Sequence, residues 1–273
     1  MRGMTRSLRA ALALAALARA LRAPRPISGP WPQAYPAKQR CSKCGLCDTS
    51  FVSRVKDACA FLGDGMARID ALEPAVHGRA RRLDDAEGAV ADEAHFGVHE
   101  RLFTARATPA VDGAQWTGIA TTLAASALSA GLVDAVVVVA GDARDPLAPA
   151  PLLCRTEAEV RRGRGVKPSL CPSLEVLDEV AADASIARLL FCGVGCAVQA
   201  LRALDPAADL GLAELYVMGT NCVDNSPSAR ATRDFVGAAL GAPPEEGAYY
   251  AYEFMQDFQA NGGPLALSVG DEA

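Results

Sequence analysis

The sequence predicts an α/β fold, in which a mostly parallel sheet is covered by helices and a Cys-rich segment precedes it. Three short apolar, β-branched stretches at 133–142, 187–194 and 213–221 have the composition of buried strands. Helix-like stretches alternate with them, and this alternation is typical of parallel sheets. The Cys-rich segment at 38–65 stands apart from this pattern. Ligands of such sheets bind at the carboxyl ends of the strands, here in GDARD, GVGC and GTNC.

The bulk composition is that of a globular protein. The chain has 273 residues, of which 51% are hydrophobic and 22% charged, enough for a large core. The formal net charge of −5 argues against a general nucleic-acid binder, which needs a basic face. No stretch is long and apolar enough for a transmembrane helix.

Residues 1–36 have the composition of a targeting segment. Arginines recur in an Ala/Leu background, and no Asp or Glu precedes Asp48. Organelle transit peptides are Arg-rich and poor in acid in the same way, although an ordinary N-terminal helix is the alternative. We therefore expect a targeting segment at 1–36, a Cys-rich segment and loop at 37–112, and an α/β domain at 113–273.

Several connections and helices can be assigned from local composition. Residues 69–112 are polar and predict a loop with short elements. Small and apolar residues predict a helix over 115–132, with Gly131 as its C-terminal stop. The Pro-rich residues 145–153 predict a loop, and 196–204 a further helix.

Two helices carry N-cap signals. The stretch 156–165 begins with Thr156, and Glu159 follows at the spacing of a capping box. The stretch 173–183 has Ser173 as its expected N-cap.

The main chemical signal is the cysteine run CSKCGLC. It places Cys41, Cys44 and Cys47 at two-residue spacing, and Cys59 follows. Ferredoxin-type runs use this spacing to hold an iron–sulfur cluster. Four cysteines can also hold a structural zinc ion, and scattered buried thiols are a third interpretation. The spacing favours iron and sulfur.

Two further cysteines follow predicted strands. Cys196 lies in GVGC and Cys222 in GTNC, so they come close in space if the two strands are neighbours. Each could equally be a small buried hydrophobic residue. Cys154 and Cys171 have no metal-like spacing and are expected to be structural.

The motif GAQWTG at 113–118 opens a predicted helix. Backbone N–H groups at a helix N-terminus suit a phosphate, although a tight turn explains the glycines as well. The dinucleotide fingerprint GxGxxG is absent.

Longer blocks of the sequence resemble a known family. CSKCGLCDTSFVSRVKDACAFLGDGM, GAQWTGIATT, LLFCGVGCAVQALR, LYVMGTNCVDN and YEFMQDF are similar to the coenzyme F420 hydrogenase/dehydrogenase β-subunit family. Within it, they most resemble the plant and algal enzymes that reduce the 7-hydroxymethyl group of chlorophyll a. The resemblance runs from about Tyr35 to Phe258.

The resemblance implies an activity, cofactors and a partner. The implied enzyme is a chloroplast oxidoreductase with FAD and two 4Fe-4S clusters. It would take electrons from reduced ferredoxin and convert 7-hydroxymethyl chlorophyll a to chlorophyll a. The alternatives are a divinyl chlorophyllide 8-vinyl reductase and a non-catalytic electron-transfer module with a single cluster.

The resemblance also implies site residues. Cys41, Cys44, Cys47 and Cys59 would hold one cluster, and Cys196 and Cys222 would contribute to the other. The implied flavin-binding residues are Gln115, Trp116, Thr117, Gly118, Thr121, Thr122 and Lys167. Family members continue past YEFMQDF with a further Cys-x-x-Cys pair, whereas this chain runs on as QANGGPLALSVGDEA. We therefore expect the second cluster to be incomplete in this chain, and catalysis by it alone to be impaired.

Overall fold

The computed structural model describes most of the chain between Cys41 and Leu240, and two short segments beyond it. The described residues are 41–62, 69–82, 93, 96–112, 114, 117–141, 145, 147–165, 167, 169–222, 228–240, 250–252 and 267–269. The predicted targeting segment at 1–36 lies outside them, as do Gln115 and Trp116.

A four-stranded mixed sheet forms the centre of the molecule. Its strands are β1 (Ala135–Gly141), β2 (Pro149–Cys154), β3 (Arg188–Val194) and β4 (Glu214–Thr220), in the order β2-β1-β3-β4. The pairs β1/β3 and β3/β4 are parallel, and β1/β2 is antiparallel. The predicted α/β fold with a mostly parallel sheet is confirmed, and all three predicted strands form.

The expected loop at 145–153 was wrong in part, because its second half is strand β2. β2 pairs only with β1 and is therefore an edge strand, where a proline without an N–H is tolerated. Pro149 pairs opposite Gly141 and Pro151 opposite Val139. The prolines led to the prediction of a loop, whereas an edge strand tolerates them because it needs hydrogen-bond partners on one side only.

The helices agree with the local signals in two cases. α5 (Ile119–Ser129) ends in a Schellman motif, in which Gly131 is left-handed and the Leu132 N–H donates to the Ala127 carbonyl. α6 (Glu157–Arg162) has the predicted capping box between Thr156 and Glu159.

The predicted N-cap of the next helix was wrong. α7 (Leu177–Ala182) begins four residues after Ser173, with Val176 at its N-cap and no side-chain cap bond. The Ser173 hydroxyl is buried and donates instead to the Cys171 carbonyl at 3.4 Å. Ser173 therefore lies in the turn that precedes α7 and not at its N-cap.

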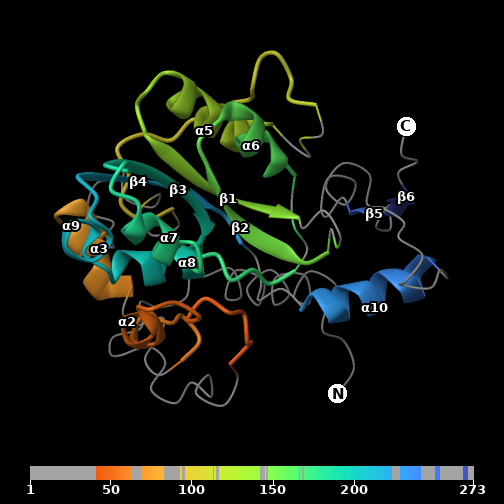
Figure 1. Cartoon of the computed structure of the whole chain (residues 1–273), viewed down its shortest axis with the longest axis horizontal. Coiled ribbons are helices and arrows are strands. Elements are labelled where there is room, and N and C mark those ends of the chain that lie inside the picture. The colour runs from red at the N-terminus through yellow and green to blue at the C-terminus, as the bar shows by residue number, and fades with distance from the viewer. Residues whose placement is uncertain are drawn as a thin grey trace, which may run out of the picture.

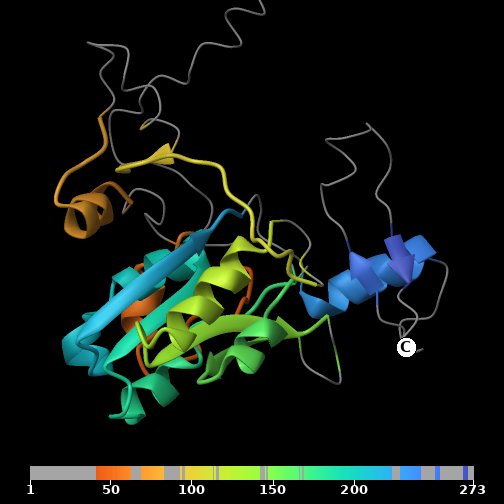
Figure 2. The same cartoon turned by 90° about the horizontal axis from the view of Figure 1, so that it is seen from above.

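Helices cover both faces of the sheet, as Figure 1 shows. α5 and α6 cover one face around Val136, Val138 and Leu190. α8 (Gly195–Arg202), α9 (Pro206–Leu210) and α7 belong to the other face, whose core contains Val137, Leu189 and Phe191. Seen from above in Figure 2, α5 lies along the sheet.

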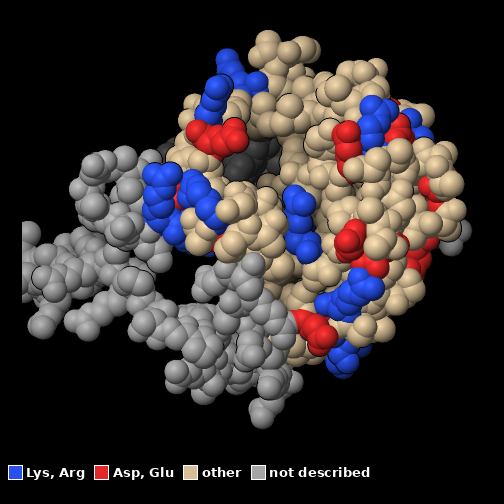
Figure 3. Space-filling view, turned by 90° about the vertical axis from the view of Figure 1, so that its left-hand side faces the viewer, with Lys and Arg blue, Asp and Glu red and all other residues tan. Residues whose placement is uncertain are grey.

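The remaining elements lie outside the sheet and the helices that cover it. They are α2 (Val52–Asp57), α3 (Ile69–His77), α10 (Ala229–Leu240) and the antiparallel pair of β5 (Tyr250–Tyr252) with β6 (Leu267–Val269). Val55 of α2 is nevertheless buried in the same core cluster as α7 and α8. α3 is a nine-residue helix within the segment predicted as a loop with short elements. In the part of the chain described, no helix has the length and apolarity to cross a membrane. On the side seen in Figure 3, acidic and basic side chains are interspersed.

Candidate functional site

Five cysteines line one cavity beneath the sheet. Cys41, Cys44, Cys47 and Cys59 come from the Cys-rich segment, and Cys196 comes from the first turn of α8. The cavity has a volume of about 270 Å³, and Leu46, Val55 and Ala200 contribute apolar lining. The structure therefore brings together the four predicted ligands of the first cluster, and it adds a thiol that had been expected at the second.

Two residues of the cysteine loop have left-handed backbone. Lys43 has φ 54° and Gly45 has φ 80°, which turns the chain twice between Cys41 and Cys47. A Cβ on Gly45 would lie 2.7 Å from the Cβ of Pro172, so a glycine is required for this close approach. A non-glycine residue at positive φ is uncommon, and nothing in the neighbouring residues indicates the Lys43 conformation.

Backbone N–H groups point at two of the sulfur atoms. The Lys43 N–H donates to Cys41 Sγ at 3.4 Å, and the Phe61 N–H donates to Cys59 Sγ at 3.5 Å. Hydrogen bonds to the sulfur atoms are also found around the thiolate ligands of iron–sulfur clusters. Among the described residues, no three Cys, His, Asp or Glu side chains converge closely enough to hold a single metal ion.

The cysteine segment is attached to the α/β domain by core packing and by polar tethers. Leu46 and Val55 are buried in the same core cluster as α7 and α8. The Ser50 N–H donates to the Asp178 carboxylate at 3.1 Å, and the Ser50 hydroxyl bonds the same group. These contacts place the cysteine loop against α8 without a covalent link.

A third tether is buried. Gln199 on α8 donates to the Ala58 carbonyl at 2.9 Å. The role of Gln199 was not evident from the sequence, because a single Gln in a mostly apolar helix carries no local signal of its distant partner.

The strand register brings the segments that carry Cys196 and Cys222 to the same end of two neighbouring strands. Val194 pairs with Thr220 in the parallel ladder, and each cysteine lies two residues beyond one of these. The predicted condition for their approach, that the two strands are neighbours, is met. Burial raises the pKa of the Cys196 thiol to about 11, and nearby Cys44 and Cys222 add to that rise. Cys196 thus lies near both the cysteine loop and Cys222.

The remaining cysteines fall into two groups. Cys154 is completely buried and Cys192 packs against the same core, on the α5/α6 face; burial raises the pKa of both thiols to about 12. Cys171 lies next to Pro172, which contacts Gly45, and burial raises its pKa to about 11. A structural role fits Cys154, as predicted, whereas Cys171 lies near the cysteine loop.

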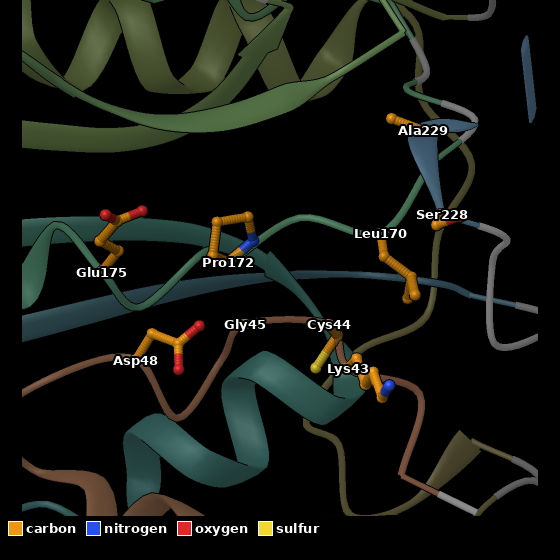
Figure 4. A pocket seen from close by; sticks show the side chains of 9 residues that line it. All are labelled: Lys43, Cys44, Gly45, Asp48, Leu170, Pro172, Glu175, Ser228 and Ala229. Carbon is orange, nitrogen blue, oxygen red and sulfur yellow. The ribbon is translucent and has the colours of Figure 1, made fainter. Parts of the chain in front are cut away.

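A second cavity adjoins the loop from the opposite side. It has a volume of about 280 Å³ and lies between the loop, residues 170–175 and the start of α10, with Cys44 in its wall. In Figure 4 the Cys44 sulfur is directed toward the helix below the loop, and Pro172 lies above Gly45. Cys44 therefore borders both cavities.

Four of the predicted flavin residues, Thr117, Gly118, Thr121 and Thr122, lie at the start of α5. Gly118 is its left-handed N-cap and gives no side-chain cap, and the first turn has no acidic residue. The Ala107 N–H donates to the Thr117 carbonyl at 2.8 Å, which fixes the approach to the helix. Thr121 and Thr122 are half-buried in its first turn. Such an N-terminus suits an anionic group.

Lys167 is bound to backbone. Its Nζ donates to the carbonyls of Gly163, Arg164 and Gly165 at 2.7, 2.7 and 2.9 Å. Burial lowers its pKa to about 8, and the charge of Arg164 adds to the shift. Because an ammonium group has three donors, these carbonyls use all of them. A flavin contact would require Lys167 to leave at least one.

Comparison with known proteins agrees with this architecture. The structure defines the general class of this protein as an α/β protein with a cavity lined by cysteine thiols. The family model for the coenzyme F420 hydrogenase/dehydrogenase β-subunit N-terminal region matches residues 102–178. The chain is 53% identical over 227 residues to the "7-hydroxymethyl chlorophyll a reductase, chloroplastic" of Oryza sativa subsp. japonica, covering 83% of this chain and 45% of that protein.

Two more distant relatives extend the comparison. An uncharacterized protein of Nostoc (all1601) is 43% identical, over 82% of this chain and 53% of that protein. The coenzyme F420 hydrogenase subunit beta of Methanosarcina barkeri is 30% identical, over 50% of this chain and 48% of that protein. The chain is thus similar to the coenzyme F420 hydrogenase/dehydrogenase β-subunit family. It spans about half the length of the relatives it matches. The name of the rice relative agrees with the predicted plastid location.

Proposed function

We propose that this chain contributes an iron–sulfur and flavin site to an oxidoreductase that converts 7-hydroxymethyl chlorophyll a to chlorophyll a with electrons from reduced ferredoxin. The observation that carries the proposal is the cavity lined by five thiols. The substrate assignment is supported by the 53% identity to the rice reductase.

The cavity fits an iron–sulfur cluster in donor chemistry and in size. Thiolates are the protein ligands of these clusters, and the four-cysteine run has the spacing that they use. A zinc site needs four ligands about 2.3 Å from one ion, whereas in the described part of the chain no three Cys, His, Asp or Glu side chains converge in this way. The cavity of about 270 Å³ leaves room for a body of several atoms.

Two separate sets of cysteines in this chain would bind the two clusters. Cys41, Cys44, Cys47 and Cys59 would hold one cluster, with Lys43 and Phe61 N–H groups stabilising the sulfur charge. Cys196 and Cys222 would face the second.

The flavin would bind at the same edge of the molecule. The first turn of α5, at Gly118 to Thr122, would bind its phosphate, and Thr117 and Lys167 would lie nearby. When bound, the clusters supply single electrons and FAD supplies two-electron chemistry.

The first experiment measures iron and acid-labile sulfide in anaerobically prepared full chain. We expect both, with a visible band that reduction bleaches. Cys44→Ser should lower the iron content, whereas Cys154→Ser, which alters a buried thiol on the opposite face, should not. Wild-type protein without iron would overturn the proposal.

A second experiment tests the substrate. Reduced ferredoxin and 7-hydroxymethyl chlorophyll a are incubated with the full chain and, separately, with a relative that has the length of the rice protein. Chlorophyll a is then measured by chromatography. Product from the relative alone would place the missing part of the activity outside this chain. Product from neither would overturn the pigment assignment.

A further inference from the structure

Gln199 is a buried polar side chain in a mostly apolar helix. It is 7% exposed, and its Nε2 donates to the carbonyl of Ala58, which lies 141 residues earlier in the sequence. Burying an amide group costs free energy unless the group is hydrogen-bonded, and the Ala58 carbonyl provides such a bond for Gln199.

The acceptor oxygen belongs to the peptide unit that leads into Cys59. Ala58 is the C-cap of α2, and the N–H of Cys59 is in the same planar peptide as the Ala58 carbonyl. On the other side of Cys59, the Phe61 N–H donates to its sulfur at 3.5 Å. A bond to the Ala58 carbonyl therefore orients the backbone from which the Cys59 side chain starts.

Gln199 and Cys196 lie three residues apart on α8. Residues at this spacing share a helix face, and Cys196 lines the same cavity as Cys59. One helix face thus provides a thiol and also holds the backbone of a thiol from a distant segment. Neither Ser50 nor Leu46, which dock the other end of the segment, reaches Cys59 in this way.

We propose that Gln199 is a positioning residue that holds Cys59 at the cavity, opposite Cys196, and thereby keeps a cluster bound. The role rests on the function proposed above, because it requires that Cys59 is a ligand. Outer hydrogen-bond partners of metal ligands affect metal retention by about 10–100-fold.

The test follows iron release from anaerobically prepared full chain to a chelator. Gln199→Met keeps the side-chain size and removes the donor, and we expect release faster by on the order of 10-fold. The electron paramagnetic resonance spectrum of the reduced protein should also change. Thr156→Ala, which weakens the α6 cap on the opposite face, is the matched control and should change neither. Gln199→Asn shortens the side chain by one methylene and gives a milder variant if Gln199→Met does not fold.

A double variant separates positioning from general stability. In a Cys59→Ser background, Gln199→Met should not speed iron release further, because the ligand through which Gln199 acts is gone. Fully additive effects would overturn the inference, as would wild-type release rates in both Gln199 variants. Iron-free wild-type protein would instead remove the proposed function itself, so the two failures are distinguishable.

Discussion

Gly45→Ala tests how tightly the cysteine loop is held against the domain. The substitution adds one methyl group at φ 80°, where its carbon would lie 2.7 Å from the Pro172 Cβ and 3.4 Å from an Asp48 carboxylate oxygen. The left-handed backbone costs an L-residue about 1–2 kcal/mol. Overpacking against a backbone-anchored proline ring costs about 1–3 kcal/mol more.

Together these two terms predict that Gly45→Ala lowers the free energy of unfolding by about 2–5 kcal/mol. Gly131→Ala is the matched control, because Gly131 has φ 66° and no atom within 4 Å of an added Cβ. The backbone cost and the gain from a stiffer unfolded chain are then common to both variants.

Urea unfolding followed by circular dichroism measures both variants, and their difference isolates the contact with Pro172. We expect that difference to be about 1–3 kcal/mol. Because the loop must move to relieve the contact, Gly45→Ala should also bind less iron than Gly131→Ala. Equal unfolding free energies for the two variants would refute the close approach.

Three further changes have expected outcomes of different kinds. Thr156→Ala removes the capping box of α6 and should cost about 1 kcal/mol in urea unfolding, with no effect on iron content; a loss of iron would contradict the separation of the two faces. Asp134→Asn should cost about 1–3 kcal/mol at pH 7, because the carboxylate accepts bonds from the Arg188 guanidinium and the Arg188 N–H at 2.7 and 2.8 Å. Those bonds hold the pKa of the Asp134 carboxyl below its ordinary value of 3.8. Their contribution to the free energy of unfolding is therefore present above that pH and is lost as the pH falls through the lowered pKa. A stability difference between wild-type protein and Asp134→Asn that stays constant from pH 6 to 3 would contradict this assignment. Cys44→Ser should lose iron while Cys154→Ser retains it, and equal iron contents would remove Cys44 from the ligand set.

Features that depend on adjacent residues were predictable from the sequence. The capping box at Thr156 and Glu159 and the glycine stop at Gly131 each involve residues within one or two helical turns. The central strands β1 and β3 follow from apolar runs that only a buried position can accommodate. The close grouping of Cys41, Cys44 and Cys47 is likewise a matter of spacing.

Features that depend on distant partners were missed. Residues 149–154 have loop-like prolines, and they become a strand because β1 offers a free edge. Ser173 had the composition of an N-cap, but α7 begins only at Leu177, and Leu174, Leu177 and Val180 pack into the buried core of the domain.

The site shows the same division. The sequence by itself determined that four cysteines of the N-terminal segment lie together and that Cys196 and Cys222 each follow a strand. Only the tertiary structure decided that Cys196 shares the cavity with Cys59 and that Gln199 reaches the Ala58 carbonyl. Local spacing fixes what a short loop can gather, because the chain between its residues has few conformations. Contacts between residues more than 100 positions apart depend instead on tertiary packing. The buried core around α7 and α8 determines which helix face lies toward the cysteine loop.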